Sequence, residues 1–133
     1  MKYFTIKELC DSITAKAYGI NNHTISATVA DNLIRLVDNV LDPLRTAYGK
    51  PINVNSGYRC EKLNRIVKGV ANSHHMLGMA ADLDAGSKEE NKKLFQLILK
   101  LKLPFTQLIN EHNYDWVHVS FDRNNIKRET LNL

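Results

Sequence analysis

The sequence predicts an α+β domain with a small mixed or antiparallel sheet and helices packed on one side of it. Three observations support this prediction. A long amphipathic segment occupies residues 24–48, short alternating segments follow it, and a second helical segment lies between two of these at residues 87–101. Elements in this order are typical of a sheet covered on one face. With 133 residues, the chain is long enough for one domain with its own core, residues 1–133.

The composition indicates an ordinary globular protein, with 44% hydrophobic and 24% charged residues. The net charge of +4 favours approach to anionic polymers, which include nucleic acid and the bacterial cell wall. No dense basic run with interleaved aromatic residues is present, so we expect no nucleic-acid partner. No apolar run approaches the ~20 residues that span a bilayer, so we expect no stable membrane insertion. We also expect a monomer.

The first residues and the cysteines bear on the compartment. Residues 1–12 contain no apolar stretch followed by a small-residue cleavage site, so no secretory signal peptide is seen. The two cysteines, Cys10 and Cys60, are too few for a disulfide framework. We expect both thiols to be free, while a bridge between them stays open.

The N-terminal part of the chain is predicted to be helical. Short helical pieces are expected in residues 3–20, where Thr5 caps the first of them. The strongest periodic segment is Thr24–Tyr48, in which apolar residues recur at steps of three and four. Thr24 is placed to cap its start, and Pro43 should kink or restart the helix.

The remainder of the chain is predicted to alternate strands and helices. The expected strands, recognised from alternating or apolar runs, are residues 51–56, 78–84, 105–110 and 116–121. Helices are expected at residues 60–67 and 87–101, the second one capped by Ser87. The residues after Asp122 are polar, so residues 122–133 are expected to form a loose tail.

Two motifs contain residue types that bind metals. The first is Ser73-x-His75-x-x-Gly78-x-Ala80-x-Asp82, and the second is Asp115-x-x-His118. Strand geometry lets Asp82 and His118 point into one cleft while their apolar neighbours face the core. Two histidines and one carboxylate, with a fourth position left for water, form the ligand set of a catalytic zinc. We therefore expect one zinc per chain, held by His75, Asp82 and His118.

Peptide hydrolysis at such a site needs further groups. Zinc lowers the pKa of its water from ~15.7 towards ~7, and a general base then takes a proton from it. Asp115 is the first candidate for this base, provided that a turn or bulge brings it to the side of His118, and Glu111 is the second. Arg59 is the candidate for holding a substrate carboxylate or steadying an oxyanion.

Four more residues near the motifs have both a functional and an ordinary interpretation. Ser73 either hydrogen-bonds the substrate or shapes its loop. Trp116 and Tyr58 either line the cleft and bind substrate or pack in the core. His74, one position from His75, is an alternative metal ligand.

These motifs, together with Ser56-Gly57-Tyr58-Arg59, resemble the family of zinc D-Ala-D-Ala carboxypeptidases and L-Ala-D-Glu endopeptidases. The resemblance covers about Phe4 to Ser120 and implies the fold that these enzymes share with the hedgehog signalling domain. It implies a zinc metallopeptidase that hydrolyses bonds involving D-amino acids in peptidoglycan stem peptides. The positions that match the family are His75, Asp82 and His118 for zinc, Arg59 for substrate binding and Asp115 for acid/base catalysis.

One departure from the family pattern concerns Asp115. The carboxypeptidase and dipeptidase branches usually carry Glu at this position, whereas Asp resembles the endopeptidases of phage endolysins. This likeness implies a protein made in the cytoplasm that acts on the cell wall after release, by phage lysis or virion delivery. The alternative from a different class is a catalytically weak or inactive wall-binding or structural virion module on the same fold.

Overall fold

The computed structural model describes residues 1–133 and contains one five-stranded sheet in the order β1-β2-β4-β3-β5. The strands are β1 (Asn53–Ser56), β2 (Ala80–Asp84), β3 (Gln107–Glu111), β4 (Trp116–Ser120) and β5 (Glu129–Asn132). All neighbouring strands pair antiparallel except β3 and β5, which are parallel. The predicted α+β class with a mixed sheet is confirmed.

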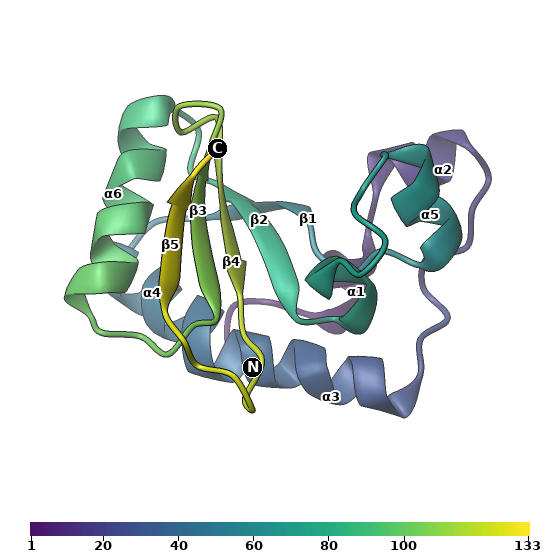
Figure 1. The fold of residues 1–133 in the computed structure, drawn as a ribbon, viewed down its shortest axis with the longest axis horizontal. Coiled ribbons are helices and arrows are strands. Elements are labelled where there is room, and N and C mark those ends of the chain that lie inside the picture. Colours follow the sequence, from purple (N-terminus) through teal and green to yellow (C-terminus); the bar gives the residue numbers. More distant parts are fainter.

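Helices precede and interrupt the sheet (Figure 1). They are α1 (Ile6–Cys10), α2 (Ile13–Ala17), α3 (Ala27–Leu36), the π-helical η1 (Val37–Leu41), α4 (Asp42–Tyr48), α5 (Glu61–Ile66), the 3₁₀ turn η2 (His74–Leu77) and α6 (Lys88–Lys100). Helix α6 packs against β3 and β4, and α4 packs against α6. None of the helices combines the length and the apolar character needed to cross a bilayer.

The two faces of the central strands carry different residues because successive side chains of a strand point to opposite sides. On one face Leu83, Leu108, Val117 and Val119 are fully buried in the core beneath the helices. The other face of β2 and β4 carries the polar residues that form the site described below. The core thus fixes the backbone of β2 and β4 from behind.

The long N-terminal helix differs from its prediction in two details. Its cap is Ser26 rather than Thr24, because the Ser26 hydroxyl accepts a hydrogen bond from the Val29 amide at 3.1 Å. Pro43 lies in the first turn of α4, and the wider π turn η1 immediately precedes it. A proline lacks the amide proton and crowds the preceding turn, so the helix widens there instead of breaking.

The C-terminal residues form strand β5, so the expectation of a loose tail is wrong. Backbone amides of Arg128, Glu129 and Leu133 donate to carbonyls of the segment that contains β3, at 3.0, 3.0 and 2.8 Å. The Arg128 guanidinium also lies over the Phe105 ring, 4.7 Å from its centroid. These bonds satisfy an edge of the sheet that would otherwise be open.

Candidate metal centre

His75 lies on the short turn η2, which is built by its own sequence. The Ser73 hydroxyl accepts a hydrogen bond from the His75 amide at 3.1 Å and thereby caps the turn. Ser73 is buried and makes this bond within its own loop, which agrees with the second of its two interpretations, that of shaping the loop. The turn leads directly into β2, and His75 is therefore held next to the first residues of that strand.

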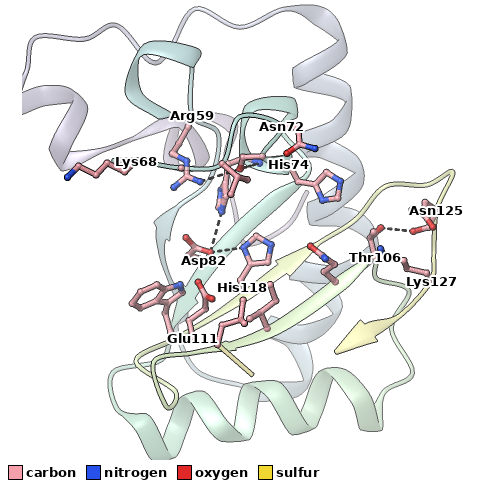
Figure 2. A pocket seen from close by; sticks show the side chains of 18 residues that line it. Arg59, Lys68, Asn72, His74, Asp82, Thr106, Glu111, His118, Asn125 and Lys127 are labelled. Atoms are coloured by element: carbon pink, nitrogen blue, oxygen red, sulfur yellow. Dashed lines mark hydrogen bonds and ion pairs between the residues drawn. The ribbon is translucent and has the colours of Figure 1, made fainter. Parts of the chain in front are cut away.

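Asp82 and His118 are register partners on β2 and β4. One Asp82 carboxylate oxygen, Oδ1, lies 3.0 Å from His118 Nδ1 and 3.3 Å from His75 Nε2. The candidate ligand atoms of the three residues all lie within 4.8 Å of one another. Figure 2 shows the Asp82 carboxylate beside the His118 ring, with dashed lines for its two contacts. The structure thus brings together the three residues that the sequence singled out.

The hydrogen bonding of His75 fits a metal ligand. Its Nδ1 lies 2.6 Å from the carbonyl oxygen of Gly57, which can only accept. Nδ1 therefore donates to this carbonyl, and Nε2 faces the Asp82 oxygen. Two lone pairs that face each other require a cation or a proton between them. Histidine ligands of zinc usually have such an outer carbonyl partner.

The charge state of Asp82 also fits that of a metal ligand. Burial alone would raise the pKa of this carboxyl, but the charges and hydrogen bonds of His75 and His118 hold the pKa below its usual range. Asp82 is therefore an anion between two imidazoles. Two nitrogens and one carboxylate oxygen are the donors of a three-residue zinc site that leaves a position open.

The three ligands lie in the middle of a cleft of about 630 Å³ (Figure 2). Arg59, Ser73 and Trp116 line this cleft, so Trp116 takes the first of its two predicted positions, in the wall of the cleft. Tyr58 does not line it: this ring packs against the core and faces a separate surface depression. His74 lines the cleft but is not one of the three clustered ligands.

Arg59 is a cation without an acidic partner. Its guanidinium contacts the Ser73 hydroxyl at 3.3 Å, and its Nε is buried with no hydrogen-bond acceptor. Burial lowers the pKa of Arg59, and the charge of Asp82 opposes this. A half-buried guanidinium with free donors is suited to binding a carboxylate.

The structure does not bring Asp115 to the metal ligands. Its Oδ1 accepts a hydrogen bond from Lys88 Nζ at 2.6 Å, which lowers the pKa of Asp115. The preceding residues His112, Asn113 and Tyr114 all have positive φ angles, of 48°, 52° and 64°. This left-handed run shapes the β3–β4 turn, and Asp115 lies outside the residues that line the cleft.

Glu111 is the carboxylate that faces the ligands instead. It is the last residue of β3 and the register partner of Trp116 on β4. Because Ile109 is the partner of His118, Glu111 lies on the same face of the sheet as His118. It lines the cleft, and Figure 2 shows its side chain directed towards the ligands. The signal in the sequence was that Glu111 lies two positions after Ile109, so both share one face when the strand extends to Glu111.

An α+β fold with a His-Asp-His set in an open cleft, beside an unpaired arginine and a carboxylate, has the features of a candidate hydrolytic metal centre. Comparison with known proteins gives the family. A family model described as peptidase M15 matches residues 2–120, and the chain belongs to this family. The chain is thereby a member of a family of zinc peptidases.

The chain is also similar to the zinc D-Ala-D-Ala carboxypeptidase of Streptomyces albus G. The two are 53% identical over 49 residues, which are 36% of this chain and 19% of that relative. The match thus spans about a fifth of the relative's length. Together with the family and the His-Asp-His group, it supports zinc as the metal.

Proposed function

We propose that the protein is a zinc peptidase that hydrolyses peptide bonds in peptidoglycan stem peptides, as a D-Ala-D-Ala carboxypeptidase or an L-Ala-D-Glu endopeptidase. The observation that supports this most is the His75, Asp82 and His118 cluster in a cleft that also holds the unpaired cation of Arg59. Stem peptides carry free carboxylates that such a cation would bind. The resemblance of the motifs and the carboxypeptidase relative support the same substrate class.

Each residue of the cleft has a proposed role. A bound zinc would supply a Lewis acid that polarises the scissile carbonyl and lowers the pKa of water. Arg59 would orient the substrate through a carboxylate, with Ser73 fixing the position of its guanidinium. Trp116 contributes a wall of the cleft next to Glu111. Glu111 would take a proton from the attacking water and return it to the leaving amine.

A second candidate function has one observation in its favour. Asp115, which matches the family's acid/base position, is bound to Lys88 in this structure. If Asp115 were the required base, the cleft as built would bind wall peptides without turning them over. The protein would then be a cell-wall-binding or structural virion module.

We predict that Glu111→Gln abolishes hydrolysis while Asp115→Asn leaves most of it. Glu111 faces the candidate ligands, so replacing its carboxylate by an amide should lower kcat about 100-fold or more, the usual contribution of a general base. Asp115→Asn removes only a surface ion pair and should change kcat less than about threefold. The measurement is mass spectrometry of stem peptides incubated with each zinc-loaded protein.

The two variants control for each other because both replace a carboxylate by an amide in the segment that joins β3 to β4. Zinc content must be equal in both. Loss of activity in Asp115→Asn alone would give the role of base to Asp115. Absence of any new fragment from the zinc-loaded wild type would favour the binding module. The fragment masses also decide between cleavage at L-Ala-D-Glu and at the D-Ala end.

The proposal needs a route to the wall. We propose release from the cytoplasm through phage lysis or delivery with a virion, in line with the endolysin-like Asp115. Intact cells that produce the protein should then show wall hydrolysis only after the membrane is permeabilised.

A further inference from the structure

The charges along the cleft are unevenly distributed. The lysine and arginine side chains that line it are Arg59, Lys68 and Lys127. Lys127 Nζ lies 3.5 Å from a Glu129 carboxylate oxygen, whereas Arg59 and Lys68 have no carboxylate within 4.0 Å. Figure 2 shows Arg59 and Lys68 on one side of the candidate ligands, with the Lys68 ammonium directed outward, and Lys127 on the other side. One end of the cleft is therefore positively charged, whereas at the other end the charge of Lys127 is compensated by Glu129.

The backbone holds Lys68 in an unusual conformation. Its φ angle is +59°, in the left-handed region that residues with a side chain seldom adopt. A left-handed residue commonly ends a helix, and Lys68 directly follows the C-cap residue of α5. The buried Asn64 holds this loop in place. Its side-chain nitrogen donates to the Val70 carbonyl, and its backbone carbonyl accepts from the Gly69 amide, both at 2.9 Å.

From these observations we infer that Lys68 is a specificity-determining residue that binds a second substrate carboxylate next to the one held by Arg59. The substrate fragment on this side of the scissile bond is then a dicarboxylate, such as a peptide ending in an acidic D-amino acid. This inference rests on the proposed function, because it takes the metal ligands as the position of the scissile bond. It extends that function by giving the cleft a direction.

The chain offers a matched control for Lys68. Lys102 also follows a helix directly, is exposed and has a positive φ angle of 54°, but it does not line the cleft. A lysine placed only to cap a helix would behave alike at both positions. Asparagine tolerates the left-handed conformation, so Lys68→Asn and Lys102→Asn each remove one charge without new backbone strain.

The experiment is isothermal titration calorimetry of two dipeptides into zinc-loaded Glu111→Gln protein, chosen so that binding is measured without turnover. L-alanyl-D-glutamate has two free carboxylates, and in L-alanyl-D-isoglutamine one of them is an amide. We expect the diacid to bind about tenfold more tightly, the worth of one charge-assisted hydrogen bond. Lys68→Asn should reduce this ratio to about one, and Lys102→Asn should leave it unchanged.

Two results would overturn the inference: equal binding of the two dipeptides to the Glu111→Gln protein, or a ratio that Lys68→Asn leaves intact. An equal loss in Lys102→Asn would also overturn it, because the effect would then be one of net charge. Failure of the proposed function looks different. In that case the wild type cleaves no stem peptide, while the dipeptide ratio and its dependence on Lys68 are still observed.

Discussion

Gly57 connects the fold to the candidate metal centre at the scale of a single residue. Its carbonyl oxygen fixes the tautomer of His75. A Cβ atom at this position would lie 2.3 Å from the Leu9 carbonyl oxygen, so the backbone of α1 leaves space for glycine alone. The position of the carbonyl therefore depends on the absence of a side chain.

We predict that Gly57→Ala weakens zinc binding as well as the fold. The forced backbone shift should cost about 1–3 kcal/mol of unfolding free energy. Displacing the partner of His75 should weaken zinc binding by about 10–100-fold. Chelator competition measures the zinc affinity and thermal unfolding measures the stability.

Gly49→Ala is the control for this prediction. Gly49 ends α4 with a φ angle of 77° and has open space around it, far along the chain from the ligands. Gly49→Ala should lower the free energy of unfolding by about 1 kcal/mol without changing the zinc affinity. Unchanged zinc affinity in Gly57→Ala would contradict the role assigned to the carbonyl.

The clustering of the three candidate metal ligands was predictable from sequence, and the position of Asp115 away from them was not. Asp82 and His118 belong to motifs whose spacing places them on one face of two strands, and His75 precedes the first of these strands in the same motif as Asp82. The orientation of Asp115 depends instead on three consecutive left-handed residues in the β3–β4 turn. Such φ angles depend on the whole turn, so residue spacing alone does not reveal them.

At the scale of elements, the amphipathic helices and the central strands followed from pattern. Helix α6 begins after Ser87, whose hydroxyl accepts from the Glu90 amide at 3.1 Å, as expected for a cap. Strand β5 has no such signal, because it is short, half-exposed and largely polar. Its formation depends on the open edge of β3, which is a property of the folded sheet.

We predict that the amides of the last strand are protected from hydrogen exchange. Glu129 and Leu133 donate backbone hydrogen bonds to Thr106 and Asn110, so a peptide covering residues 129–133 should exchange more slowly than the turn at residues 123–127. Exchange mass spectrometry of the intact chain gives both rates in one experiment. Equally fast exchange in the two peptides would show that the C-terminal residues are a tail after all.

For the whole molecule, the candidate centre joins three separate elements. His75, Asp82 and His118 come from η2, β2 and β4, so a metal bound to all three links them in the folded state. A ligand that binds only the folded protein adds about 2.7 kcal/mol of stability at a free concentration 100 times its Kd. The net charge of +4 would also favour approach to an anionic wall.

The measurement that tests the central claim most directly is the zinc content of the purified protein and of His118→Ala, determined by native mass spectrometry with Asp115→Asn as control. We predict one zinc per chain in the wild type and in Asp115→Asn. In His118→Ala the affinity should fall by more than the roughly 100-fold that an outer partner contributes. A wild type without zinc, or His118→Ala with undiminished zinc, would contradict the assignment of this centre.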